Sequence, residues 1–224
     1  MAAAPEPLGP VSAPAVEGAA RRIAAHVRTT PVLSLEPGAL GLPGRVTLKL
    51  ELHQHAGSFK ARGALHRLLT AGAGPGSTVL AASGGNHGVA VAWAASRLGA
   101  RAEIYIPSMT APAKVQRLRA FGAQVTVAGA EYADAADAAD ARARELLATG
   151  VNPIGVHPYD HPDVIAGAGT MSRELDHQVP GLDTVVVAVG GGGLMSGAGA
   201  WYANRARLVA VEDISVPPPE GSDA

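Results

Sequence analysis

The 224-residue sequence contains no cysteine, which excludes a disulfide framework, a thiolate metal site and a cysteine nucleophile. Aromatic residues make up only 4%, so the core must be aliphatic. No apolar run approaches the ~20 residues that span a bilayer. With 18 basic and 19 acidic residues, the chain has no electrostatic footprint for nucleic acid or an anionic membrane. We expect a cytoplasmic protein with no nucleic-acid or membrane partner.

Hydrophobic residues make up 47% of the chain, enough for a sizeable core, and they recur in short runs. The pattern predicts strands over 46–52, 78–82, 102–106, 124–127, 154–156, 184–189 and 208–211. It predicts helices over 19–27, 59–69, 87–98, 112–121, 132–147, 163–175 and 194–204. Alternating strands and helices imply βαβ units and a mainly parallel sheet. The valine run within 184–189 predicts a strand buried on both faces.

Lysine is rare, because only Lys49, Lys60 and Lys114 contribute to the 18 basic residues. Lys60 follows a Gly-Ser turn that opens a predicted helix. A lysine in this place can act as a nucleophile if desolvation keeps its amine neutral. From this residue alone, an ordinary surface lysine is the alternative.

Two glycine-rich junctions between a strand and a helix are candidate anion sites. One runs from Ser83 to Gly88 (SGGNHG), and the other from Gly190 to Leu194 (GGGGL). Backbone N–H groups at the start of a helix favour a carboxylate or a phosphate. A flexible turn is the alternative interpretation for each junction.

Two further clusters favour ordinary structure over a metal site. His157 and His161 are four residues apart, but Pro158 and Pro162 interrupt any helix that would align them. The repeated aspartates of 134–140 recur every third residue, which spreads charge around a solvated helix. A cation site is the alternative in both cases.

Taken together, these motifs resemble the fold-type II family of pyridoxal phosphate enzymes, in the branch of threonine/serine dehydratases and serine racemases. The resemblance runs from about Thr30 to Glu212. It rests on LELHQ (50–54), GSFKARGA (57–64), SGGNHG (83–88), HPYDHPDVIAGAGT (157–170) and GGGGL (190–194). It implies a two-lobed α/β fold with mainly parallel sheets flanked by helices, similar to the β subunit of tryptophan synthase.

The resemblance also implies roles for single residues. Lys60 would form a Schiff base with pyridoxal 5'-phosphate and later remove the substrate α-proton. Phe59 would pack near the cofactor ring, and Asn86 would bind its phenolic oxygen. The substrate carboxylate would be bound by Ser83, Gly84, Gly85, Asn86 and His87. The cofactor phosphate would be bound by Gly190, Gly191, Gly192, Gly193 and Leu194. Glu212 would bind a monovalent or divalent cation.

The activity implied is that of an ammonia-lyase, which converts L-threonine or L-serine to a 2-keto acid and ammonia. Racemases of the family carry a second serine at the position of Gly84, so we favour elimination over racemisation. Cysteine synthase-like β-replacement ranks lower, because its substrate loop would be richer in serine and threonine. The small-molecule partner is therefore an amino acid, and we expect a homodimer.

The expected domain organisation places residues 1–20 in a flexible tail and 70–151 in a small domain. Residues 21–69 and 152–212 would form a large domain. The proline-rich stretch 213–224 would be a disordered tail. Family members continue well beyond this point, so we expect an incomplete large domain. An alternative function follows from this: a truncated, inactive or weakly active relative that at most binds pyridoxal phosphate.

Overall fold

The computed structural model of the chain describes residues 11–212. In this part, helices and strands alternate along much of the chain, as the sequence predicts. The helices are α1 (Ala13–Ile23), α2 (Lys60–Thr70), α3 (Asn86–Leu98), α4 (Pro112–Ala120), α5 (Tyr132–Ala148), α6 (Pro162–Gln178) and α7 (Gly193–Tyr202). The strands are β1 (Val32–Leu35), β2 (Val46–Lys49), β3 (Thr78–Ala82), β4 (Arg101–Ile106), β5 (Gln124–Val127), β6 (Ile154–Gly155), β7 (Thr184–Val189) and β8 (Arg207–Glu212). None of these helices combines the length and the apolar character that a membrane-spanning helix needs.

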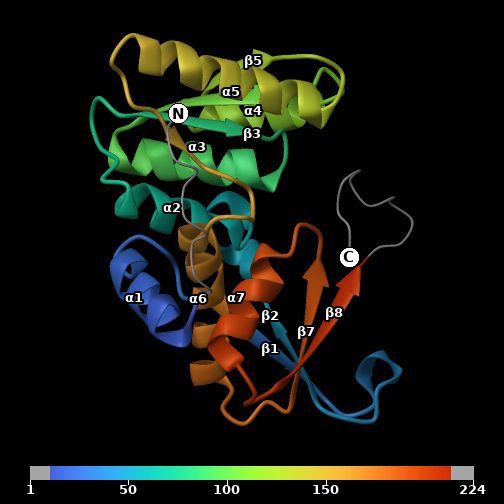
Figure 1. Cartoon of the computed structure of the whole chain (residues 1–224). Helices are drawn as coiled ribbons and strands as arrows, with labels where there is room; N and C mark the ends of the chain where they lie inside the picture. The colour runs from blue at the N-terminus through green and yellow to red at the C-terminus, as the bar shows by residue number, and fades with distance from the viewer. Residues whose placement is uncertain (1–10, 213–224) are drawn as a thin grey trace.

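The largest sheet has four parallel strands in the order β5-β4-β3-β6. Helix α5 covers one face of the sheet and α3 covers the other, as Figure 1 shows. Val79, Leu80 and Ala81 of β3 are all buried, because the central strand has a helix on each side. This arrangement confirms the predicted α/β class with a parallel sheet flanked by helices. Strand β6 pairs with β3 although it lies beyond residue 151, the expected end of the small domain.

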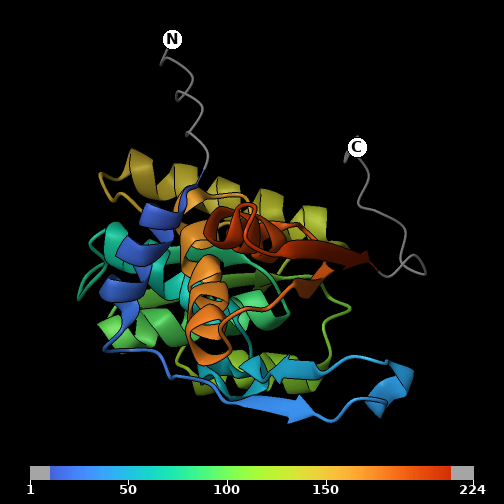
Figure 2. The ribbon, with the colours of Figure 1, turned by 90° about the horizontal axis from the view of Figure 1, so that it is seen from below.

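The other strands form two pairs near the opposite end of the molecule (Figure 1). β7 and β8 run parallel, whereas β1 and β2 form an antiparallel hairpin, whose connecting loop projects from the body in Figure 2. The prediction that 184–189 is buried on both faces is wrong. Val185 and Val187 are buried, but Val186 between them is 65% exposed, because no described element covers that face.

The N-terminal expectation also needs correction. Residues 13–20 belong to α1, and Val16 and Ala19 on this helix are fully buried, so the flexible tail predicted for 1–20 does not extend through them. The helix starts after Ser12 with a proline in its first turn, where the missing N–H is tolerated. Residues 1–10 and the predicted tail 213–224 lie outside the described residues.

Helices α2, α6 and α7 pack with their backbones in close approach. A Cβ atom built on Gly63 of α2 would lie 2.7 Å from the carbonyl oxygen of Val164 in α6. One built on Gly169 of α6 would lie 2.8 Å from the carbonyl oxygen of Gly197 in α7. Only glycine permits such distances. Helix α6 therefore fixes α2 and α7 relative to each other.

A buried ion cluster anchors α2. The guanidinium of Arg62, which is 1% exposed, donates to both carboxylate oxygens of Glu51 at 2.9 and 2.7 Å and to Glu174 at 2.9 Å. Lys49 Nζ donates to the same Glu174 and to the carbonyl oxygen of Thr30 at 2.8 Å. The cluster joins β2, the start of α2 and the middle of α6. It thereby fixes the helix turn that begins with residue 60.

Candidate active site

Lys60 is the first residue of α2 and follows a tight 3₁₀ turn, His55–Gly57. Gly57 has a φ of +72°, a conformation that glycine adopts with little strain. Arg117 of α4 closes this turn, because its Nη2 donates to the carbonyl oxygen of Ala56 at 2.8 Å. A Cβ atom on Gly57 would lie 2.6 Å from that nitrogen. The turn that presents Lys60 therefore requires glycine.

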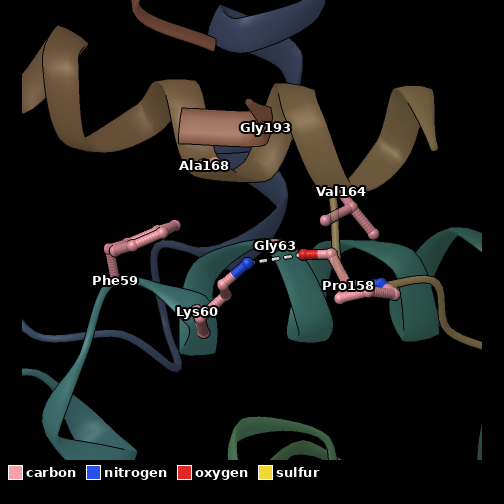
Figure 3. A pocket seen from close by; sticks show the side chains of 7 residues that line it. All are labelled: Phe59, Lys60, Gly63, Pro158, Val164, Ala168 and Gly193. Atoms are coloured by element: carbon pink, nitrogen blue, oxygen red, sulfur yellow. Dashed lines mark hydrogen bonds between the residues drawn. The ribbon is translucent and has the colours of Figure 1, made fainter. Parts of the chain in front are cut away.

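The Lys60 amine points into the interior, toward the chain segment that precedes α6 (Figure 3). Its Nζ donates to the carbonyl oxygen of Pro158 at 2.6 Å and lies 5.2 Å from the centroid of the Phe59 ring. Burial lowers the pKa of Lys60, and no described carboxylate opposes this effect. A lowered pKa increases the neutral fraction of the amine, which is the form that attacks a carbonyl carbon.

The loop Gly190–Gly193 joins β7 to α7. Gly192 has a φ of +80°, and the N–H groups of the first helical turn have no partner within the helix. Tyr159 lies against this loop. A Cβ atom built on Gly191 would overlap the Tyr159 ring at Cδ1, and one on Gly193 would be 2.9 Å from the Tyr159 Cβ. The loop accommodates Tyr159 only because it carries no side chains, whereas Leu194 packs into the cluster beneath β7.

The second glycine-rich loop, Ser83–Gly85, leaves the end of β3 and leads into α3. Ser83 Oγ accepts a hydrogen bond from the Gly85 N–H at 3.1 Å. A Cβ atom built on Gly84 would lie 2.6 Å from Oγ1 of Thr110, so the Thr110 side chain fills the space that a residue at 84 would need. Asn86 is the first residue of α3, and it is exposed.

His87 has a different environment from the one its predicted role requires. The ring is 5% exposed, and its Nε2 lies 2.9 Å from the carbonyl oxygen of Val156. Because a carbonyl oxygen only accepts, Nε2 carries the proton and donates it. Burial lowers the pKa of His87 to about 4, so the ring is neutral at pH 7. The donor that remains for a substrate carboxylate is the backbone N–H in the first turn of α3.

One short segment touches all three predicted parts of the site. The carbonyl oxygen of Val156 accepts from His87, that of Pro158 accepts from Lys60, and Tyr159 covers the glycine loop before α7. Phe59, Lys60 and Gly193 also line one small cavity. The structure thus brings together residues that are up to 134 positions apart in the sequence, counted from Phe59 to Gly193.

The predicted cation ligand stands apart from this group. Glu212 is the exposed last residue of β8. Within residues 11–212, no three histidine, aspartate or glutamate side chains lie close enough to hold a metal ion. Nδ1 of His157 accepts from the Asp160 N–H at 2.8 Å, and Nδ1 of His161 caps α6. The role of Glu212 stays a prediction.

Sequence reasoning did not identify four residues that shape the site: Thr110, Arg117, Pro158 and Tyr159. Thr110 and Arg117 act on loops more than 25 positions earlier in the chain, so no local pattern reveals them. Pro158 and Tyr159 belong to a motif that indicated a loop. The sequence does contain a signal that could have drawn attention to Tyr159. It is one of only four tyrosines, and it lies in a stretch with a proline on either side.

The geometry defines a class of site. A partly buried amine without an acidic partner among the described residues, beside a glycine loop at a helix N-terminus, suits a ligand that carries both a carbonyl carbon and a phosphate. A second helix N-terminus, that of α3, suits another anion.

Comparison with known proteins agrees with this class. Residues 23–223 match the family described as pyridoxal-phosphate dependent enzymes, and the chain belongs to that family. This confirms the resemblance inferred from the motifs.

Two curated relatives are dehydratases. Phenylserine dehydratase from Ralstonia pickettii is 36% identical over 94% of this chain and 62% of its own length. The biosynthetic L-threonine dehydratase from Haemophilus influenzae is 39% identical over 79% of this chain and 34% of its own length. The structure of maize serine racemase matches with a TM-score of 0.80 and 33% identity, over 91% of this chain and 62% of that one. The chain thus spans between a third and two thirds of these relatives.

The residues fit pyridoxal phosphate in kind. Lys60 offers a buried amine, Phe59 offers an aromatic ring, and Gly190–Gly193 offer N–H groups free of side chains, which suit a phosphate. The cavity beside Lys60, however, has a volume of about 10 Å³, which is room for about one water molecule. The donors suit the cofactor, while the segment around Pro158 fills the space between them.

Proposed function

We propose that this chain forms the cofactor and substrate site of a pyridoxal-phosphate-dependent ammonia-lyase. Its substrates would be L-threonine and L-serine, and its products a 2-keto acid and ammonia. The observation that carries the proposal is the Lys60 amine, which is partly buried beside a glycine loop with no acidic partner among the described residues. The two dehydratase relatives support the substrate class, because threonine and phenylserine are both β-hydroxy amino acids.

The residues of the site would have the following roles. Pyridoxal phosphate, when bound, supplies an electron sink for the substrate α-carbon. Lys60 Nζ, whose pKa burial lowers, would accept the α-proton. The Ser83–Gly85 loop and the first turn of α3 would hold the substrate carboxylate and orient the α-carbon toward Lys60. Gly190–Gly193 would bind the cofactor phosphate.

The environments of the three lysines support the choice of Lys60. Burial lowers the pKa of Lys49 as well, but Glu174 in the ion cluster opposes this effect and favours the charged amine. Lys114 is exposed on α4, where water stabilises the charged form of an amine. Among the three, Lys60 alone combines burial with the absence of a carboxylate partner in the described part of the chain.

The three lysines also make the test specific. The full chain is incubated with pyridoxal phosphate and reduced with borohydride, and the modified residue is identified by peptide mass spectrometry. We expect modification at Lys60, its loss in Lys60→Ala, and no loss in the matched Lys114→Ala variant. Keto acid release from L-threonine and L-serine is then measured. Modification spread equally over exposed amines would contradict the proposal.

Elimination is favoured over racemisation by the loop before α3. Gly84 has no hydroxyl, and a serine at this position would have to displace Thr110, because its Cβ would lie 2.6 Å from the Thr110 Oγ1. Measuring D-serine formation from L-serine in the same assay tests this choice, because a racemase would accumulate the D-isomer without keto acid. β-Replacement ranks lower, since the loop has a single serine.

A second candidate function is cofactor binding without turnover. It is favoured by the exposed apolar face of β7 and β8, where Val186 is 65% and Val211 51% exposed. Modification of Lys60 without keto acid release from either amino acid would select this candidate.

We also propose the wider organisation. Residues 70–151 would form a small lobe, and 21–69 with 152–212 a large one, with the cofactor between them. Support comes from the position of Lys60, which starts a helix packed against α3 and lines a cavity with the first residue of α7. Homodimer formation and a cytoplasmic location complete the proposal, and light scattering of the purified chain tests the first.

A further inference from the structure

The Tyr159 segment, His157–Asp160, lies where the cofactor would bind. It forms no helix or strand. The carbonyl oxygen of Pro158 holds the Lys60 amine at 2.6 Å, and the Tyr159 side chain packs against Gly191 and Gly193 of the glycine loop (Figure 3 shows the first of these contacts). Both groups that the proposed function assigns to the cofactor, the amine and the glycine loop, are therefore engaged by the same four residues.

The segment is compact and is held mainly by its own contacts. Nδ1 of His157 accepts from the Asp160 N–H at 2.8 Å, and the His157 ring lies edge-on to the Tyr159 ring with centroids 4.7 Å apart. Among the described residues, its only hydrogen bond to the body of the protein is the one from Lys60. A unit that is internally bonded but weakly attached can move as one piece.

The residues on either side are fixed. The Val156 N–H donates to the carbonyl oxygen of Leu80 at 3.1 Å, and the Val156 carbonyl accepts from His87. On the other side His161 caps α6 by accepting from the Asp163 N–H. Movement is therefore confined to the segment between residues 156 and 161, while both glycine loops and α2 keep their places.

The Tyr159 segment and the cofactor ring cannot occupy the space beside Lys60 at the same time. The cavity of about 10 Å³ beside Lys60 cannot hold a pyridine ring. Tyr159 packs against Gly191 and Gly193, so it covers part of the glycine loop, whereas Cβ atoms built on Gly190 and Gly192 would meet nothing within 4 Å.

We infer that the Tyr159 segment is a gate over the cofactor site, closed in this conformation and held by the packing of Tyr159 on the glycine loop, and that pyridoxal phosphate reaches Lys60 only after the segment moves and Pro158 releases the amine. The inference rests on the proposed function for the identity of the ligand. In this scheme the apparent affinity is reduced by the fraction of chains whose gate is open. The loading rate also levels off at high cofactor concentration, because gate opening then limits it.

The test compares the wild-type chain with Tyr159→Phe and Tyr159→Ala. The readout is the rate at which pyridoxal phosphate becomes fixed to Lys60, followed by its visible absorbance and by borohydride trapping. The phenylalanine variant keeps the ring and should behave like the wild type. The alanine variant should load at least about tenfold faster, as expected when a gate closed in most chains is removed.

A second test needs no substitution. The loading rate of the wild-type chain is measured over a range of pyridoxal phosphate concentrations. We expect the rate to level off at high concentration, because gate opening then limits it.

The outcomes separate the two proposals. If no variant is modified at Lys60, the proposed function fails and the gate with it. If Lys60 is modified but the wild type and Tyr159→Ala load at equal rates, the gate alone is wrong. A wild-type loading rate that keeps rising in proportion to cofactor concentration would also overturn the gate, and this result does not depend on how Tyr159→Ala folds.

Discussion

Substituting Arg62 tests whether the buried ion cluster holds the helix that presents Lys60. Arg62→Met keeps much of the side-chain volume but removes three hydrogen bonds, two to Glu51 and one to Glu174. Glu174 retains Lys49 as a cation. Glu51, which is 9% exposed, retains only the hydroxyl of Thr30 at 2.6 Å among its described side-chain partners. The variant therefore leaves one buried carboxylate without a cation.

Removing one partner of a buried ion pair costs about 3–5 kcal/mol of folding free energy. For a domain of this size each kcal/mol shifts the thermal midpoint by about 2–4 °C. We therefore expect the midpoint to fall by roughly 6–20 °C. Adding Glu51→Gln to Arg62→Met should recover part of the loss, because the uncompensated charge disappears.

The assay is thermal and urea unfolding at pH 7, followed by far-ultraviolet circular dichroism. The matched control is Arg21→Met. The Arg21 side chain is 71% exposed and pairs with Glu17 one helical turn away at 3.4 Å, so its loss should change stability by less than about 0.5 kcal/mol. If Arg62→Met shifts the midpoint no more than this control does, the cluster does not anchor α2.

Two further predictions concern packing and pH. In a urea titration, Gly63→Ala should destabilise the chain by about 1–3 kcal/mol, because the added Cβ would lie 2.7 Å from the carbonyl oxygen of Val164. The control is Gly18→Ala, whose added Cβ would meet nothing within 4 Å. This variant should be neutral or stabilising in the same titration. The pKa of His87 is lowered from 6.5 to about 4 by burial, so its contribution to stability is present above pH 6.5 and is lost as pH falls toward 4. In His87→Gln, the unfolding midpoint should depend less on pH between pH 4 and 7 than it does in the wild type. A pH dependence as steep as that of the wild type would contradict this prediction.

Periodicity in the sequence predicts several of the parallel strands well. The observed bounds of β3, β5 and β7 coincide with the predicted ranges, because short apolar runs between turn residues leave few alternatives. The sequence does not predict β1, since its four residues carry little periodic signal. The alanine-rich start of α1 has low apolar contrast and so resembles a tail, although Pro14 after Ser12 is typical of a helix start.

What the sequence does not contain is the information on which surfaces meet. Whether Val186 is buried depends on what lies across from β7, and no local pattern encodes that. The same holds for Tyr159 and Thr110, whose importance comes from glycine loops distant in the sequence. The motifs predict which donors the site contains, and the fold determines which of them are free, as His87 illustrates through its bond to Val156.

The glycine contacts among α2, α6 and α7 have a consequence for ligand size. Lys60 and Gly193 are the first residues of two helices that meet a third, α6, backbone to backbone, at distances already below those of ordinary side-chain packing. The span from the Lys60 amine to the glycine turn before α7 therefore cannot shrink, and stretching it would open voids along both helix contacts. A molecule that bridges these two points is selected by its length, so analogues with a longer or shorter arm between aldehyde and phosphate should be rejected.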